Sequence, residues 1–298
     1  MNVVRAAIFL LQLSVFLTVC SVGLQAGLAA SVWLFRRPRL LFRSLLAMNF
    51  FMPLFAVVLA MKFALYPEVK VALVFLAVSP VPPILPRLQS KLGGSSHYIC
   101  GLLASSALLS LILVPLTMEL LGKIFGRDLH GNPATIAKVM ATSVLLPLIL
   151  GMLIHHFHPA LAQRTSKPLA RIALLLLLGS ASVLLVFALP GIARLVGNGT
   201  ALAIAIFVLM GTLVGHWLGG PEPANRSTLA LATASRHPGL AIALASADFP
   251  AQKPMIAAAV ILYMLVKVVA LIPYNSWQKH RLGLSGGREP AEPGHRAA

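Results

Sequence analysis

Acidic side chains are scarce in this sequence of 298 residues, where seven Asp and Glu stand against 24 Lys and Arg. Charged residues of both signs make up only 10% of the chain, while 58% is hydrophobic and the mean hydropathy is +0.89. A water-soluble domain of this length needs a charged surface to stay dispersed. The composition therefore excludes an ordinary soluble protein and favours one that uses lipid as its solvent.

Long polar segments between the apolar blocks are also lacking. The two cysteines, Cys20 and Cys100, both lie in apolar stretches, where they are interpreted as small core residues. The basic residues fall in short loops, with no basic domain interleaved with aromatic residues, so nucleic acid is excluded as a partner. No loop is long enough to hold a soluble domain, which predicts one transmembrane domain over residues 1–278.

What the sequence does contain is a series of apolar blocks of about 20 residues, the length that crosses the hydrocarbon layer as a helix. These blocks predict an all-α polytopic membrane protein with about nine transmembrane helices. Their predicted ranges are 6–27, 44–63, 69–92, 96–122, 135–157, 168–190, 199–219, 227–248 and 254–275. Residues 279–298 are polar and rich in Gly and Pro, and they are predicted to form a disordered cytoplasmic tail.

The distribution of Lys and Arg over the loops predicts the orientation, because retained basic residues mark the cytoplasmic side. With the N-terminus outside, 14 basic residues fall on the cytoplasmic side and eight on the outer side. A cleaved signal peptide is the alternative for the first span, but it would place the cluster Arg36–Arg43 outside. We therefore predict a multi-pass protein of the cell inner membrane, with its N-terminus outside and its C-terminus in the cytoplasm.

The third span is interrupted by four prolines, at positions 80, 82, 83 and 86. Each proline removes a backbone donor and clashes with the preceding turn, which excludes a continuous helix over Ser79–Pro86. At about 1.5 Å per residue, the break begins near the bilayer midplane. Unwound backbone at that depth must be buried in protein or line a wet cavity. A proline kink made for packing is the alternative interpretation.

The eighth span carries a second break, where Arg236 and His237 precede Pro238-Gly239. The Pro-Gly pair ends one half-helix and permits another to start. An arginine near the bilayer centre costs at least about 2.5–3.5 kcal/mol on insertion scales, so an anionic or wet partner is predicted for Arg236. A side chain that snorkels to the surface is the alternative. The candidate substrate and crossover residues are Ser79, Pro80, Pro82, Pro83, Pro86, Arg236, His237, Pro238 and Gly239.

The two breaks stand five spans apart, so the first four spans can correspond to the last four with inverted topology. An inverted repeat with one discontinuous helix in each half is an architecture of secondary transporters, in which the breaks cross at the midplane. The N-termini of half-helices carry partial positive charge. Together with Arg236, they predict a site for an anion.

Several motifs, in order along residues 21–270, resemble the bile acid:sodium symporter family, in a divergent form of bacterial type. They are Arg36-Arg37-Pro38-Arg39 followed by Phe51-Met52-Pro53, the break at Ser79-Pro80, Gly93-Gly94 before a long helix reaching Pro115, and Gly239-Leu240-Ala241-Ile242-Ala243-Leu244-Ala245. The resemblance implies the nine-span form of that fold, with a panel domain and a core domain. It also implies that the broken helices cross inside the core.

The family typically carries Glu-x-x-x-Gln-Asn before the Gly-Leu-Ala motif, and these side chains help to bind two sodium ions. Hard cations take several oxygen ligands. The corresponding positions here are Ala232, Arg236 and His237. By ungapped comparison, the other sodium positions fall on or near Met48, Leu85, Pro86, Ile99 and Leu103. The side chains present are apolar or cationic, so the sequence argues against bound sodium, and no cofactor is expected.

Two roles are open for Arg236. One is that its guanidinium supplies the positive charge that a sodium ion provides in relatives. The other is that it binds a substrate carboxylate or sulfate directly in a bidentate pair. For His237, proton coupling and simple packing against the crossing are equally open.

The predicted function is secondary transport of a small organic anion by alternating access, and the chain is not predicted to be an enzyme. The alternative is a membrane-embedded enzyme or sensor that uses the Arg236/His237 pocket, which would need a catalytic constellation such as paired carboxylates. The seven acidic residues lie almost entirely outside the spans and do not supply one. No metal site is predicted, because His155, His156 and His158 lack carboxylate or cysteine partners. The expected partners are the substrate and the lipid bilayer, and the oligomeric state is left open.

Overall fold

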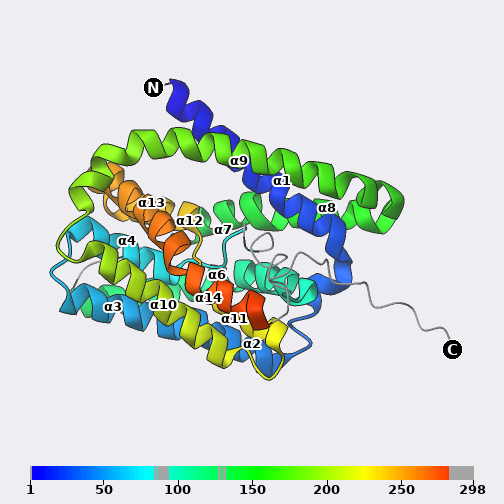
Figure 1. Cartoon of the computed structure of the whole chain (residues 1–298), viewed down its shortest axis with the longest axis horizontal. Coiled ribbons are helices and arrows are strands. Elements are labelled where there is room, and N and C mark those ends of the chain that lie inside the picture. The colour runs from blue at the N-terminus through cyan, green and yellow to red at the C-terminus, as the bar shows by residue number, and fades with distance from the viewer. Residues whose placement is uncertain (1, 84, 86–93, 127–128, 130–131, 282–298) are drawn as a thin grey trace.

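The computed structural model describes residues 2–83, 85, 94–126, 129 and 132–281, and every regular element within those ranges is a helix (Figure 1). The predicted all-α class is confirmed. In chain order the elements are α1 (Asn2–Val32), α2 (Pro38–Leu45), η1 (Leu46–Phe51), α3 (Met52–Lys62), α4 (Pro67–Val78), α6 (Ser96–Phe125), α7 (Pro133–Met140), η2 (Ala141–Leu145), α8 (Leu146–Phe157), α9 (Pro159–Leu195), α10 (Thr200–Leu218), α11 (Pro223–Ala234), α12 (Pro238–Asp248), η3 (Pro250–Gln252), α13 (Lys253–Ala270) and α14 (Ile272–Arg281).

Seven helical stretches of the described chain are long and apolar enough to cross a membrane. They are Val3–Gln25, Pro38–Lys62, His97–Phe125, Pro133–Phe157, Pro159–Leu195, Thr200–Leu218 and Pro250–Arg281. The other two predicted spans are the broken ones, and their described helices α4, α11 and α12 have only 12, 12 and 11 residues. The polytopic membrane fold is therefore confirmed, with its spans in the predicted order.

The ninth span continues through α13 into α14, which ends at Arg281. The predicted tail starts at residue 279, so its first three residues belong to α14. Residues 282–298, the rest of that predicted tail, lie outside the described residues.

The sixth span is longer than the sequence predicts. The prediction is 168–190, whereas α9 covers 37 residues, Pro159–Leu195. At about 1.5 Å per residue this helix is about 55 Å long, well above the hydrocarbon thickness of about 30 Å. An apolar block marks only the part of a helix that lies within lipid. Here the helix also includes a polar segment, in which Arg164 and Lys167 are exposed.

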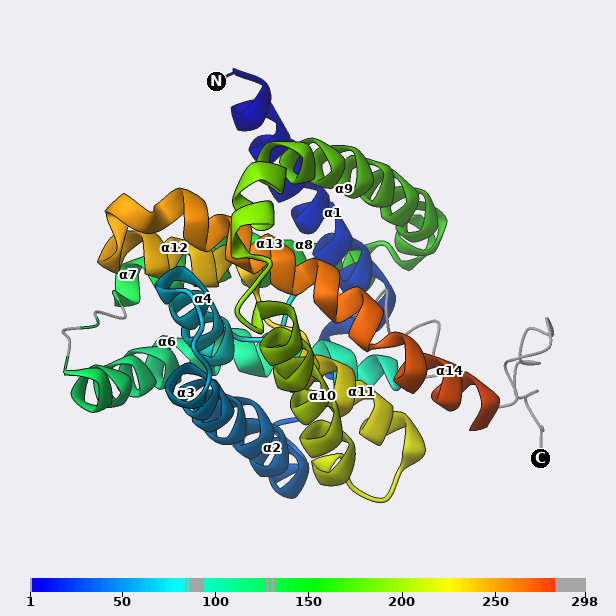
Figure 2. The ribbon, with the colours of Figure 1, turned by 60° about the vertical axis from the view of Figure 1, so that its left-hand side comes forward.

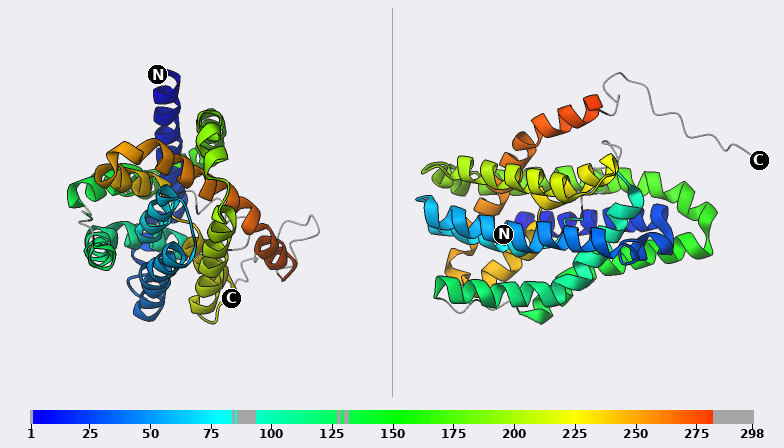
Figure 3. Two further views of the ribbon diagram at one scale, coloured as in Figure 1. Left: turned by 90° about the vertical axis from the view of Figure 1, so that its left-hand side faces the viewer. Right: turned by 90° about the horizontal axis from the view of Figure 1, so that it is seen from below.

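The helices form two groups. α1 packs against α8 and α9, and these three helices make a panel along one side of the molecule (Figure 2). The spans from α2 to α6 and from α10 to α13 make the core, seen nearly end-on in the left view of Figure 3. The panel contacts the core through α1 against α6 and through α9 against α13. This division agrees with the panel and core domains that the family resemblance implies.

Close approach of two helix backbones holds the panel together. α1 crosses α8 where Gly23 faces Gly151. A Cβ atom added to Gly23 would overlap the carbonyl oxygen of Leu148, and one added to Gly151 would overlap that of Cys20. Small residues allow helices to pack this closely in membranes, where dispersion contacts replace the hydrophobic effect.

The connections between spans gather at two opposite faces. One face carries residues 33–37, residue 158 and residues 219–222, and we call it the arginine face; it lies to the right in Figure 1. The opposite face carries residues 63–66 and 196–199. The arginine face is the one that the charge distribution assigns to the cytoplasm.

Two spans contain a π-helical turn near their middle, η1 in the second span and η2 in the fifth. A π-helical turn widens the helix and changes the pairing of its carbonyl groups, and such turns are frequent at functional sites. Met48 in η1 and Ser143 in η2 both contact the second break.

Candidate functional site

The first break begins where α4 ends at Val78. Ser79 is extended, with φ −72° and ψ 144°, as expected for a residue that precedes a proline. Residues 80–83 continue without helix and are all buried. The amide of Leu85 then donates to the carbonyl of Pro82 at 3.1 Å. Pro86, a predicted site residue, lies outside the described residues.

The second break lies between α11 and α12. Ser235 and His237 are both extended, with ψ angles of 129° and 99°. Pro238 occupies the first position of α12, where its missing N–H removes no helical hydrogen bond, and Gly239 follows it. The second discontinuous helix is thus present in full, whereas at the first break the end of α4 and the unwound residues 79–83 are described and most of the segment that follows lies outside the described residues.

Main-chain contact joins the two breaks. The amide of His237 donates a hydrogen bond to the carbonyl of Pro80, 3.0 Å away. α4 packs against α12 beside this contact. Pro80 has no helical donor because the chain is unwound there, so its carbonyl is available to a partner from the other break.

Arg236 links three spans and is completely buried. Its Nη1 donates to the carbonyl of Ser79 at 3.2 Å, and its Nη2 makes a short hydrogen bond to the carbonyl of Met48 in η1. The Arg236 amide donates to the hydroxyl of Tyr263 at 3.0 Å. That hydroxyl donates in turn to the carbonyl of Ala234 at 2.8 Å, so α13 secures the end of α11.

No carboxylate neutralises the Arg236 guanidinium within the described residues. The two ion pairs found there are Arg37–Glu222 and Glu119–Lys123, and all four side chains are well exposed. The sequence predicts an anionic or wet partner, whereas the partners found are main-chain carbonyls that the break and the π-turn leave available. These carbonyl groups accept from Nη1 and Nη2 but leave a net positive charge in a medium of low dielectric constant.

Several buried polar atoms at the second break make no hydrogen bond to any described residue. They are Nε of Arg236, Oγ1 of Thr233 and Oγ of Ser235. A small cavity beside Arg236 has room for about one water molecule and is lined in part by Asn49 and Ser106. Buried polar atoms are normally paired with water, ligand or protein. The crossing therefore has buried hydrogen-bonding atoms that could bind a further polar group.

The hydrogen bonds of His237 define its protonation. Its Nδ1 accepts from the amide of Leu240 at 3.1 Å and caps the N-terminus of α12. Its Nε2 lies 3.2 Å from Oγ of Ser143, whose hydroxyl donates to the carbonyl of Val139. An Nδ1 that accepts and an Nε2–H that donates describe the neutral imidazole. A second proton would remove the cap.

The positions that correspond to sodium ligands in the family supply no side-chain oxygen. Met48, Leu85, Ile99, Leu103 and Ala232 are all buried in the hydrophobic core. At the second break, the remaining positions that the resemblance assigns to sodium ligands hold Arg236 and His237. Because a hard cation needs several oxygen ligands, these side chains do not fit a sodium ion.

Sequence reasoning did not assign Tyr263, Ser143, or the carbonyl of Met48 to the site, and it left Lys267 without a role. Lys267 is buried, and its Nζ lies 5.6 Å from the ring centroid of Tyr263, one helical turn away. It makes no hydrogen bond or ion pair within the described ranges. A lysine inside an apolar block is a readable signal. The hydroxyl and carbonyl partners carry no such signal, because helix rotation decides them.

Comparison with known proteins agrees with the geometry. The family model described as Sodium Bile acid symporter family matches residues 12–194, which include the first break and end before α10. A search of curated proteins finds no match. The matched segment is more than half of the chain, and the two broken helices lie in a core beside a three-helix panel. The chain therefore belongs to the sodium bile acid symporter family, a family of membrane transporters.

Proposed function

We propose that this protein is a secondary transporter that moves a small organic anion by alternating access, with the guanidinium of Arg236 in place of a coupled sodium ion. The observation that supports this best is the pairing of Arg236 with the carbonyl groups of Ser79 and Met48. Those carbonyls come from two different spans, so one cationic group holds together the segments around the crossing.

A carbonyl oxygen can ligate a hard cation, and it can equally accept a hydrogen bond from an N–H donor. A guanidinium offers five N–H groups in a rigid plane and carries its charge over the whole working pH range. It therefore binds carbonyl oxygens of the kind that a hard cation takes as ligands, and no described carboxylate pairs with it. The loss of the family's Glu and Gln at Ala232 and Arg236 is consistent with this replacement.

An anionic substrate follows from the charge balance at mid-membrane. Arg236 and Lys267 are both buried, and no described carboxylate pairs with either of them. The N-terminus of α12 adds partial positive charge at the same level. A buried cation without a counter-charge is costly, so a carboxylate or sulfate near this site is stabilised.

Alternating access requires the core to move against the panel. The bond between His237 and Ser143 joins the second break to the fifth span, which continues as α8 of the panel. Such a contact must change when the two domains shift. We assign the arginine face to the cytoplasm and the protein to the cell inner membrane, following the positive-inside rule.

The test is uptake into proteoliposomes containing the purified protein. Candidate anions run from small carboxylates to steroid-like acids, and each is measured in sodium buffer and in buffer where choline replaces sodium. We expect uptake of at least one anion at equal rates in both buffers, and loss of uptake in Arg236→Ala. Strict dependence on sodium would overturn the replacement of the ion, and absence of uptake for every anion would overturn the transport proposal.

A further inference from the structure

We infer that a pocket on the arginine face binds the phosphate group of a ligand, either a membrane lipid or a soluble phosphate. The pocket lies where the connection from α1 to α2 meets the turn from α10 to α11. Its volume is about 550 Å³, within the range of about 300–1,000 Å³ typical of small-molecule sites. This inference does not depend on which substrate crosses the membrane.

Three arginines line this pocket: Arg37 just before α2, Arg39 in its first turn and Arg43 in its last turn. Across the pocket stand Gly220, Glu222 and Asn225. A Cβ atom built on Gly220 would lie 3.7 Å from Nη1 of Arg43, so that guanidinium reaches across to the α10–α11 turn. Planar guanidinium groups match the oxygen atoms of a phosphate better than any other side chain.

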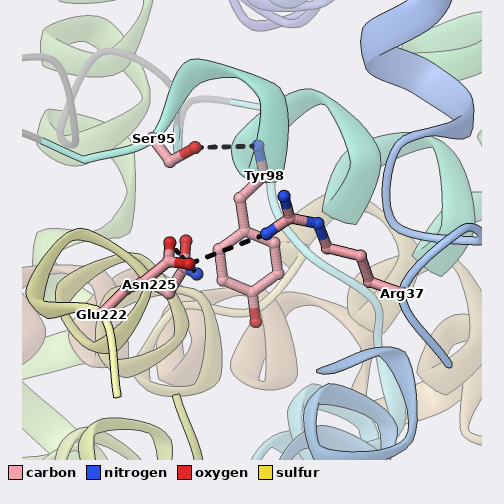
Figure 4. A network of polar contacts seen from close by, with 5 residues as sticks. All are labelled: Arg37, Ser95, Tyr98, Glu222 and Asn225. Atoms are coloured by element: carbon pink, nitrogen blue, oxygen red, sulfur yellow. Dashed lines mark hydrogen bonds and ion pairs between the residues drawn. The ribbon is translucent and has the colours of Figure 1, made fainter. Parts of the chain in front are cut away.

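Existing contacts occupy only one of these arginines. Cζ of Arg37 lies over the Trp33 ring, 4.0 Å from its centroid. Nη1 of Arg37 also lies 3.8 Å from Oε1 of Glu222 (Figure 4). The other carboxylate oxygen of Glu222 accepts from Nδ2 of Asn225 at 2.8 Å. The single acid of the pocket is therefore already engaged. Arg39 and Arg43 form no ion pair or side-chain hydrogen bond with any described residue and are exposed, so they can bind an anion without displacing a partner.

Helix polarity adds to the positive potential of the pocket. α2 begins at Pro38 and α11 begins at Pro223, and no side chain caps either helix. Pro38 and Pro223 have no amide N–H, and the amides of Leu40 and Asn225 already donate to the carbonyls of Arg37 and Glu222, so each helix start contributes mainly the positive end of its dipole. Phosphate groups bind at such helix ends when basic side chains are also present.

The positive-inside rule alone would also place arginines on this face. It explains Arg164 and Lys167 equally well, yet these two residues lie on the exposed surface of α9, outside the lining of this pocket. The difference lies in convergence: the guanidinium groups near α2 share one concavity, whereas the basic residues of α9 do not. Basic pockets between membrane helices on the cytoplasmic side hold lipid head groups in this way.

The experiment compares two double variants that remove the same charge. Arg39→Gln/Arg43→Gln empties the pocket of its unpaired cations, and Arg164→Gln/Lys167→Gln removes two charges from the same face outside the pocket. Each protein is purified in a maltoside detergent, which contains no phosphate. Binding of short-chain phosphatidylglycerol and of inorganic phosphate is then measured by native mass spectrometry and by thermal stabilisation.

We expect the pocket variant to bind the lipid probe at least about tenfold more weakly than the wild type, because it loses two charged hydrogen-bond donors. The α9 variant should bind like the wild type. Equal losses in the two variants would mean a response to net charge alone, and unchanged binding in both would also overturn the inference. Binding of phosphatidylglycerol without binding of inorganic phosphate identifies a lipid as the source, and comparable binding of both identifies a soluble phosphate.

Discussion

The amide of His237 and the carbonyl of Pro80 are joined by a hydrogen bond of 3.0 Å, so the two broken helices meet through main-chain atoms. This contact does not depend on the side chain at either position. The main-chain contact can therefore persist when neighbouring side chains are substituted. The charge and the hydrogen-bonding groups at the crossing, by contrast, change with those side chains. Substitutions at Arg236, His237 and Lys267 accordingly separate the role of the charge from the role of the fold.

Replacing Arg236 with Gln should lower the free energy of unfolding by about 2–4 kcal/mol, because the carbonyls of Ser79 and Met48 lose charged donors. Transport should be lost as well. Denaturant or thermal unfolding in detergent, together with proteoliposome uptake, measures both effects. Arg236→Lys keeps the charge but not the planar pair of donors, so it should recover only part of the stability. Full stability and activity in Arg236→Gln would contradict the linking role.

The double variant Ala232→Glu/Arg236→Gln restores the acidic and amide residues that relatives carry. We expect transport by this variant to require sodium, because a carboxylate and an amide oxygen now stand where the guanidinium stood. Thermal stabilisation by sodium chloride, compared with choline chloride, is the second readout. If neither transport nor stability responds to sodium, the guanidinium does not occupy an ion position.

Tyr263→Phe should destabilise the protein by about 1–3 kcal/mol, because it leaves the Arg236 amide and the Ala234 carbonyl unpaired inside the core. The matched control is Tyr274→Phe. The Tyr274 hydroxyl lies 2.9 Å from Nδ1 of His216, and both side chains are partly exposed, so water can replace the bond. Unfolding of the two variants in the same detergent should differ clearly. Similar losses would show that the hydroxyl at the break has no special role.

His237→Ala should cost about 1 kcal/mol through loss of the α12 cap, whereas His237→Asn should keep most of that stability because Asn is a good N-cap residue. The measurement is the unfolding midpoint of both variants. Since the imidazole already uses Nδ1 as an acceptor, its hydrogen bonds favour the neutral form. A His237→Asn protein that retains transport would therefore argue against proton coupling through this residue, and loss of transport with unchanged stability would support it.

Lys267→Met should weaken the binding of the transported anion at least tenfold, about 1.4 kcal/mol, while leaving the free energy of unfolding unchanged or higher. Lys267 has no ion-pair partner in the described chain, so its removal leaves no opposite charge stranded. Lys267→Arg is the control that keeps the charge. Anion affinity measured by thermal shift should follow the order wild type, Lys267→Arg, Lys267→Met. Equal affinity in all three would remove Lys267 from the site.

Gly23→Ala should disrupt the panel, because the added methyl group would overlap the carbonyl oxygen of Leu148. We expect a loss of roughly 2 kcal/mol, as for other overpacked sites. Gly179→Ala in α9 is the control: a Cβ there meets no described atom within 4 Å, and alanine favours the helix. The unfolding midpoint should fall in the first variant and stay or rise in the second.

Much of this fold is readable from the sequence because lipid imposes a simple length rule. The apolar blocks predict the spans in order, and the prolines after Val78 and the Pro238-Gly239 pair predict both breaks close to where the helices end. The main error in span length, at α9, has the same origin. Apolar length measures the hydrocarbon layer, and a helix can extend beyond it.

The partners at the crossing are less readable. Arg236 is evident as a charge in an apolar block, but its carbonyl partners depend on how η1 and α4 are rotated around their axes. Each π-helical turn ends two residues before a proline, Pro53 after η1 and Pro147 after η2, and a proline disturbs the helical hydrogen bonds of the preceding turn. This signal is readable in the sequence, but no π-helical turn was predicted from it. Tyr263 lies 27 positions away from Arg236, and only the docking of α13 brings them together. Composition and spacing along the sequence indicate how deep a residue lies in the membrane, whereas the rotation of its helix about the helix axis determines which residues it contacts.

Because Arg236 is part of the chain, it differs from a bound ion in the energetics of a transport cycle. A sodium ion that is released on the far side transfers the energy of its gradient to the substrate. A tethered guanidinium returns with the carrier and dissipates no gradient. The proposed transporter would therefore equilibrate its substrate rather than concentrate it with sodium. For a monovalent anion, a negative interior of 100 mV contributes about 2.3 kcal/mol toward the outside, so the membrane potential would drive net export.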